Sequence, residues 1–188
     1  MPRPLDHARR AELLSGVIDY IAERGLAELS LRPLADYLGT SSRMLIHYFG
    51  TKEQMLVAAL ETQRPDIPAM FGEVSDPRVL RTRLAQSFAV NTSGAGAVSL
   101  RVLLQVLAAA AVPHSPFRPY ADDAVTAVIK SLAEALHRIA PAHEDPEAAA
   151  TLLVSGMRGL IQDWTITADT PRITRAVNLL VAQALPGA

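Results

Sequence analysis

The sequence of 188 residues contains no cysteine, no excess of charge and no long apolar run, and each absence excludes a class of protein. Without cysteine there can be no disulfide, no thiolate nucleophile and no cysteine-ligated zinc site. The formal net charge of −1 provides no general attraction to nucleic acid. Any affinity for DNA therefore has to come from the placement of individual basic groups rather than from their number.

Targeting and membrane signals are also missing. The first residues, MPRPLDHARR, lack the apolar core of a signal peptide. The most apolar run, residues 97–112, is interrupted by Arg101 and Gln105 and is too short to span a bilayer. Hydrophobic residues make up 49% of the chain, which is typical of a globular protein with a substantial core. We expect a soluble, cytoplasmic protein with no membrane partner.

Apolar residues recur at helical spacing along most of the chain, and no segment shows the sustained alternation of a strand. The pattern predicts an all-α protein of about nine helices. Segment 64–75, with two prolines, is expected to connect two regions: an N-terminal three-helix domain, residues 1–63, and a larger helical bundle, residues 64–188. In the second region, Asp76 and Asp145 each precede a proline and are expected to begin helices.

Two short helices joined by a tight turn are predicted within the first domain. Ser30 can cap a helix that ends at Gly39, and Thr40 or Ser41 can cap the next one, which runs to about Phe49. This arrangement is typical of a helix-turn-helix, in which the second helix of the pair enters the major groove of DNA. The following residues, TKEQ, have the form of a capping box and predict a further helix.

The stretch 38–56, LGTSSRMLIHYFGTKEQML, carries many groups that can bind phosphates and base edges. Arg43 could contact guanine O6 and N7, because a guanidinium matches two acceptors. Hydroxyl, phenol and ammonium groups suit phosphate oxygens, as do free N–H groups at a helix start. Met44, Leu45 and Phe49 are expected to be core, and His47 is either a phosphate contact or a local cap. The predicted DNA-binding residues are Arg32, Thr40, Ser41, Ser42, Arg43, His47, Tyr48, Thr51 and Lys52.

Residues 10–60 resemble the DNA-binding domain of the TetR (tetracycline-repressor-like) family of transcriptional regulators. The resemblance lies in LSLRPLADYLGTSSRMLIHYFGTKEQML, at Leu34-Ala35, Leu38-Gly39, Ser41, His47-Tyr48-Phe49, Lys52-Glu53 and Leu56. Members of the family usually have a small residue in place of Arg43 and a tyrosine in place of Ile46. The operator sequence therefore cannot be carried over from the family.

The resemblance implies a C-terminal helical domain that binds a small-molecule effector and forms a homodimer through its last two helices. The apolar stripes of segments 147–164 and 172–185 agree with this, and Gly156 with Gly159 permits close approach of helices. Two such helices from each subunit would form a four-helix interface. The alternative is that both are core helices of a monomer.

Polar groups within apolar helices are the candidates for an effector pocket. Arg101 and Gln105 lie four residues apart on one face of a helix that is expected to be buried, where an unpaired guanidinium is costly. A carboxylate such as Asp122, Asp123 or Asp163 is expected to pair with Arg101. The candidate pocket residues are Phe88, Asn91, Arg101, Gln105, Met157 and Trp164.

No arrangement typical of catalysis is present. The chain has neither the Glu-x-x-His pairs of a di-iron bundle nor a G-x-S-x-G motif, and its five histidines do not have metal-ligand spacing. We expect no enzyme, metal or cofactor. The sequence predicts a DNA-binding transcriptional regulator, a repressor that a small-molecule effector releases from its operator. The alternative is a constitutive or architectural DNA-binding protein without an effector.

Overall fold

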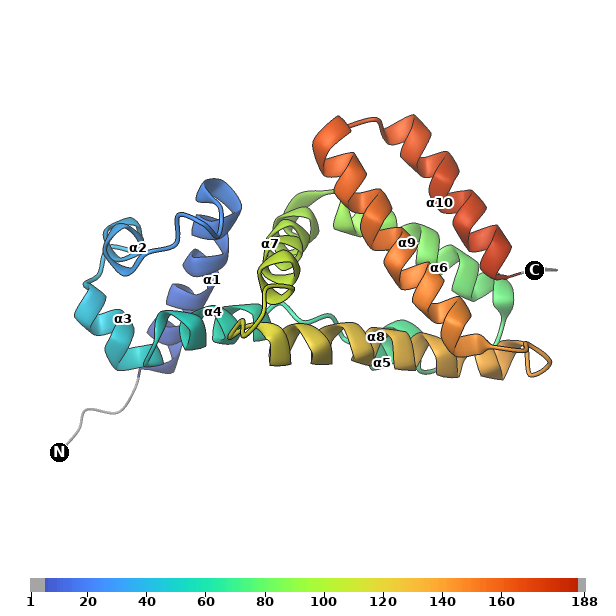
Figure 1. The fold of residues 1–188 in the computed structure, drawn as a ribbon, viewed down its shortest axis with the longest axis horizontal. Helices are drawn as coiled ribbons and strands as arrows, with labels where there is room; N and C mark the ends of the chain where they lie inside the picture. Colours follow the sequence, from blue (N-terminus) through green and yellow to red (C-terminus); the bar gives the residue numbers. More distant parts are fainter. Residues whose placement is uncertain (1–5, 186–188) are drawn as a thin grey trace. The chain divides into compact units, whose positions relative to one another are not determined.

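The computed structural model describes residues 6–185, which form ten α-helices and no strand (Figure 1). The predicted all-α fold is confirmed. The helices are α1 (His7–Arg24), α2 (Leu31–Tyr37), α3 (Ser42–Phe49), α4 (Lys52–Glu61), α5 (Ile67–Phe71), α6 (Pro77–Asn91), α7 (Gly94–Ala110), α8 (Arg118–Ile139), α9 (Pro146–Thr167) and α10 (Thr170–Ala184). The additional helix is α5, within the segment expected to be a connection. Its short turn forms because the Asp66 carboxylate accepts the N–H of Ala69.

The helices group into two compact units. The first contains the residues up to Arg64 together with Val98–Ala121, and the second contains Pro65–Ala97 together with the residues from Asp122 onward. Helices α7 and α8 each continue from one unit into the other. The first unit thus contains all of the predicted DNA-binding residues.

The first unit is built around α1, which packs against α2 and α4, while α3 packs against α2 and α4. Leu34 of α2, Leu45 of α3 and Leu56 of α4 are almost fully buried in its core. Burial of such a side chain is worth about 1.5–3 kcal/mol relative to exposure. These three leucines therefore fix α2 and α3 on α1 and α4, and within α3 only Leu45 and Phe49 are buried.

The ends of these helices follow the predicted capping pattern. Ser41 Oγ accepts the N–H of Met44 at 3.2 Å and begins α3. At the start of α4, Thr51 Oγ1 accepts the N–H of Gln54 at 3.1 Å, and the Gln54 side chain accepts the N–H of Thr51 at 2.9 Å. The predicted capping box is therefore confirmed. Ser30 lies at the N-cap of α2, but its side chain makes no capping hydrogen bond.

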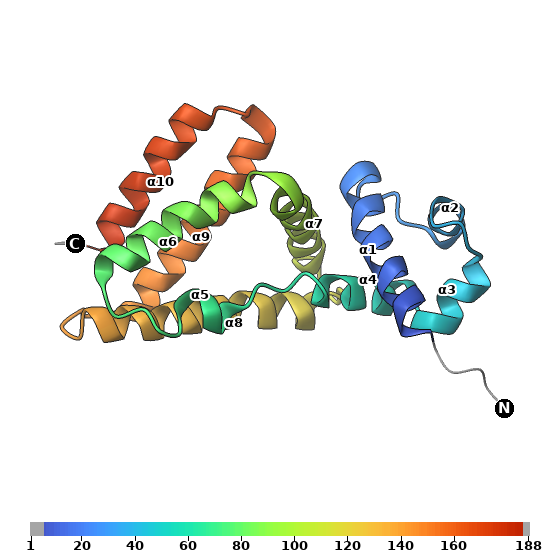
Figure 2. The same ribbon diagram turned by 180° about the vertical axis from the view of Figure 1, so that it is seen from behind.

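In the second unit, α9 and α10 run antiparallel side by side, and α6 packs against both (Figure 1, Figure 2). Leu80, Leu153 and Ile173 form the centre of this packing and are fully buried. Helices α9 and α10 approach closely at Gly156, where an added Cβ would lie 2.6 Å from Leu180 Cδ2. The absence of a side chain at Gly156 therefore allows α9 to pack against α10 within one subunit.

A polar cluster fixes the turn between α9 and α10. The Arg172 guanidinium donates to both carboxylate oxygens of Asp163, each at 2.7 Å, and to Asp169 at 3.1 Å. The hydrogen bonds from Arg172 lower the pKa of the Asp163 carboxyl. Asp163 is thus paired with Arg172, a partner that the sequence did not indicate. Nearby, Trp164 Nε1 donates to Thr170 Oγ1 at 3.0 Å.

Helix α7 is covered less than the sequence indicated. The prediction that the helix within 97–112 is buried on most sides is wrong, since the buried residues of α7 are Val102, Val106 and Ala110, and Arg101 is exposed. These buried residues lie four apart and form one narrow stripe, while most other residues of α7 are half-buried. Among residues 6–185 no single helix is long and apolar enough to cross a membrane, and α6 and α7 meet that criterion only when they are taken together as a bent pair.

Candidate DNA-binding surface

Helix α3 has an anchored face and an open face. Leu45 and Phe49, four residues apart, are its buried residues. Arg43 and His47, also four apart, point away from them and are exposed. Tyr48 lies at the edge, half-buried, with its ring centroid 5.9 Å from that of His47 in an edge-to-face arrangement. The helix therefore presents an arginine and a histidine on its outermost side.

Two apolar residues of α3 are also exposed. Met44 is 40% exposed and Ile46 is 43% exposed. The prediction that Met44 belongs to the core is wrong. Each residue of a helix is rotated by about 100° from the previous one, so that Met44 cannot share the buried stripe of Leu45 and Phe49. The sequence allowed the mistake because Met44 is apolar and directly precedes a core leucine.

The hydroxyl groups of Ser41 and Thr51 cap helices and still have a hydrogen to donate. In both caps the oxygen accepts a backbone N–H, so that the O–H proton remains available for a phosphate oxygen. Both residues are exposed, and Thr40 and Ser42 beside them are half-buried. The structure thus places these four hydroxyl groups around the two ends of α3.

Arg32 and Arg43 are basic side chains of this surface that have no partner within residues 6–185. Both are exposed, and neither forms a hydrogen bond or ion pair within residues 6–185. The arginines of α1 differ from them. Arg9 pairs with Glu12 at 2.6 Å, and the Arg10 guanidinium lies 5.3 Å from the centroid of the Phe49 ring. Arg32 and Arg43 are therefore free to bind phosphates or bases, whereas Arg9 and Arg10 already contact their own domain.

Lys52 is partly engaged inside the protein. Its ammonium donates to the carbonyl oxygen of Leu29 at 3.2 Å and lies 4.0 Å from the Glu53 carboxylate. The side chain is 39% exposed. An ammonium has three N–H donors, so Lys52 can still bind a phosphate oxygen while it keeps the bond to Leu29.

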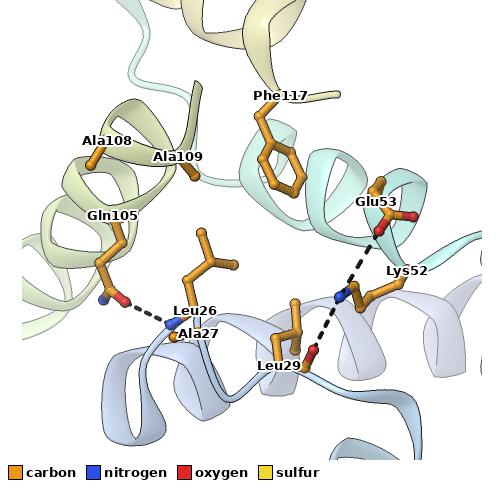
Figure 3. A pocket seen from close by; sticks show the side chains of 9 residues that line it. All are labelled: Leu26, Ala27, Leu29, Lys52, Glu53, Gln105, Ala108, Ala109 and Phe117. Carbon is orange, nitrogen blue, oxygen red and sulfur yellow. Dashed lines mark hydrogen bonds and ion pairs between the residues drawn. The ribbon is translucent and has the colours of Figure 1, made fainter. Parts of the chain in front are cut away.

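Lys52 borders a hollow of about 410 Å³ between the start of α4, the loop after α1, and α7 (Figure 3). On the opposite side of this hollow, Gln105 Oε1 accepts the backbone N–H of Leu26 at 2.7 Å. Gln105 was predicted as an effector contact, and in the structure its amide oxygen joins α7 to the loop after α1. The lining residues are Leu26, Ala27, Leu29, Lys52, Glu53, Gln105, Ala108, Ala109 and Phe117.

The six candidate pocket residues divide between the two units. Arg101 and Gln105 belong to the first unit, and the other four belong to the second. Of those four, Phe88 and Met157 are buried, whereas Asn91 and Trp164 are half-buried. Their assignment to one effector pocket remains a prediction.

One face of α9 and α10 exposes apolar and small residues. Leu152, Gly159 and Ile166 are spaced seven residues apart on α9, so they form one stripe, and all three are exposed. On α10, Leu179 is 60% exposed, and Ala182 is exposed beside it. No atom lies within 4 Å of a Cβ added at Gly159. This surface, Leu152, Gly159, Ile166, Leu179 and Ala182, is called the α9–α10 stripe below.

Residues 13–59 match the family model described as bacterial regulatory proteins, tetR family. Among curated proteins none is significantly similar in sequence to this chain. A transcriptional regulator from Rhodococcus sp. Rha1 has a similar structure, with 24% identity, coverage of 95% of this chain and 97% of that chain, and a TM-score of 0.80.

Two further structures share the fold. A TetR transcription regulator from Haloarcula marismortui is 17% identical, with coverage of 95% of this chain and 96% of that chain and a TM-score of 0.77. FadR from Bacillus subtilis, in complex with stearoyl-CoA, is 14% identical, with coverage of 94% and 98% and a TM-score of 0.72. At these identities the similarity shows a common fold.

Proposed function

We propose that this chain, whose residues 13–59 match the model of the tetR family of bacterial regulatory proteins, is a sequence-specific repressor released from its operator by a small-molecule effector. The open face of α3 is the observation on which the proposal rests. Leu45 and Phe49 anchor the helix, while Arg43 and His47 project outward from it. A short, rigid helix with a free guanidinium on its outer side fits the major groove, where arginine contacts guanine O6 and N7.

The surrounding groups supply contacts to the DNA backbone. The hydroxyl groups of Ser41 and Thr51 and the ammonium of Lys52 are placed near the two ends of α3. The first N–H groups of α4 have no partner within the helix and can bind a phosphate oxygen. Such contacts fix the position of a protein on the duplex, and the contacts of Arg43 to bases then supply sequence preference.

A homodimer would present α3 twice. In a twofold dimer the two reading helices contact half-sites about 34 Å apart, which is one turn of DNA. The α9–α10 stripe supports dimerisation through the last two helices, since it leaves Leu152 68% exposed and Leu179 60% exposed in the single subunit. Gly159 on the same stripe leaves room for a helix of the partner to approach.

An effector would act by favouring a conformation in which the two reading helices no longer match the operator. FadR, which has the same fold, was solved in complex with stearoyl-CoA, and for this chain we propose that the effector binds within residues 64–188. Helix α7 supports such a coupling. It contains Arg101 and Gln105, and its Gln105 accepts the Leu26 N–H of the DNA-binding domain.

The test is a binding assay with the DNA that flanks the coding sequence of the protein, competed by random duplex. We expect specific binding for the wild type, and for Arg43→Ala a loss of preference with residual affinity for all duplexes. Arg24→Ala is the matched control, because Arg24 is exposed at the end of α1, away from α3, and the charge change is the same. Equal effects of the two substitutions would contradict the assignment of α3.

The effector is tested on the same DNA by adding candidate small molecules and measuring operator affinity and thermal unfolding together. A true effector should stabilise the protein and weaken operator binding, because it binds the released conformation more tightly. If ligands stabilise the protein without changing operator affinity, the protein is a constitutive DNA-binding protein.

A further inference from the structure

The outer side of α3 combines polar and apolar groups in a definite order. Arg43 and His47 lie at its centre, Met44 lies toward one side and Ile46 toward the other. Neither Met44 nor Ile46 can turn inward, because Leu45 and Phe49 already occupy the buried stripe. Both apolar side chains therefore accompany Arg43 wherever α3 docks.

Exposed apolar groups on a helix that enters a DNA groove have one apolar target among the base edges. In the major groove the C5 methyl group of thymine is the apolar feature, and it distinguishes T·A from the other base pairs. Cytosine gains the same group when it is methylated at C5. Phosphate oxygens offer nothing to a side chain without a donor, so Met44 and Ile46 cannot act as backbone contacts.

We propose that Met44 and Ile46 are specificity-determining residues that contact pyrimidine C5 methyl groups on the two sides of the base pair contacted by Arg43. The inference rests on the proposed function, since it requires α3 to lie in the major groove. It predicts that the operator half-site has thymines flanking the position that Arg43 contacts. The contribution of each methyl group is the burial of one apolar carbon, about 0.8 kcal/mol or about fourfold in affinity.

The experiment begins with selection of bound duplexes from a random pool by the full-length protein. Each thymine of the selected half-site is then replaced singly by deoxyuridine, which removes the C5 methyl group and leaves the hydrogen-bonding edge unchanged. We expect about a fourfold loss of affinity at the contacted positions, measured at fixed salt, and no loss elsewhere. Replacing T·A by C·G at these positions should also weaken binding, and methylation of that cytosine at C5 should recover about fourfold.

Protein variants complete the comparison. Met44→Ala and Ile46→Ala should each lose sensitivity to deoxyuridine at one position and retain it at the other, which a double-mutant cycle measures. Both substitutions remove exposed side chains and place a better helix former in α3, so the domain is expected to remain folded. Val79→Ala is the matched control, because Val79 is 42% exposed on α6, in the other unit. It should bind every duplex like the wild type.

Three outcomes contradict the proposal. If no sequence is enriched in the selection, the proposed function fails and the inference fails with it. If a sequence is enriched but deoxyuridine changes nothing, sequence-specific binding stands and only the methyl contacts are wrong. If both alanine variants bind all duplexes like the wild type, neither apolar side chain contacts the DNA, and the inference is again overturned.

Discussion

Replacement of Gly159 by leucine should separate the dimer while leaving each subunit folded. Gly159 lies on the α9–α10 stripe, and a Cβ added there meets no atom within 4 Å. The substitution should even stabilise the isolated helix, since glycine in a helix interior is about 0.5–1 kcal/mol less favourable than a good helix former. Any loss of dimer stability in this variant would therefore come from contacts with another subunit.

The size of the effect follows from symmetry. An extra side chain in a packed interface costs about 1–3 kcal/mol, and a twofold axis places the substitution there twice. The total of about 2–6 kcal/mol corresponds to an increase of the dimer dissociation constant by about 30-fold or more. Sedimentation velocity over a range of protein concentrations measures this constant, and circular dichroism at the same concentrations measures helix content.

Gly156→Leu is the control, because it inserts the same side chain three positions earlier in α9, at a position that packs against Leu180 of α10 in the same subunit. There an added Cβ lies 2.6 Å from Leu180 Cδ2 within the subunit. This variant should lower the melting temperature of the subunit itself, by the overpacking cost of about 1–3 kcal/mol. If Gly159→Leu dimerises as tightly as the wild type, the α9–α10 stripe is not the interface and the reasoning is refuted.

Three further predictions follow from particular contacts. Lys52→Ala should weaken binding to all duplexes alike and reduce the slope of log affinity against log salt by about 0.9, which titrations at graded salt measure; a selective loss on one sequence would show that Lys52 contacts bases. The hydrogen bonds from Arg172 lower the pKa of the Asp163 carboxyl from 3.8, so the stabilisation of the fold by this pair is complete above pH 3.8 and disappears as the pH falls through the lowered pKa. Asp163→Asn should therefore unfold at a lower temperature at pH 7 and lose less stability on acidification than the wild type. Equal acid sensitivity of the two proteins would contradict the pairing. Gln105→Leu should preserve operator affinity and reduce the response to an effector that acts on the wild type, and an unchanged response would show that the hydrogen bond to the loop after α1 does not couple the effector to the DNA-binding domain.

Helix starts and the class of fold could be predicted from sequence because their causes are local. The hydroxyl of Ser41 and the Thr51–Gln54 pair cap their helices through residues three apart, and such spacing is visible in the sequence. The apolar periodicity likewise indicated helices throughout the chain. The short helix α5 was missed because Pro65 and Pro68 suggested a connection. Pro68 lies in the first turn of α5, where no backbone N–H is needed.

Side-chain exposure could not be predicted as well, because it depends on which neighbours cover a helix. Met44 was expected in the core together with Leu45 and Phe49, but it is rotated away from these two residues and is exposed. Arg101 was expected on a buried helix, yet the buried residues of α7 form one narrow stripe and Arg101 is exposed. The hydrogen bond from Leu26 N–H to Gln105 joins residues 79 positions apart, and no local pattern could have indicated it.

The most direct test of α3 as a DNA-reading helix is a footprint of the purified protein on its selected operator, with the wild type and Arg43→Ala compared at equal salt. We predict that the wild type protects two half-sites about 10 base pairs apart, related by twofold symmetry, and that Arg43→Ala loses this protection while general binding persists. Protection of a single unpaired site, or the same footprint with both proteins, would contradict the account.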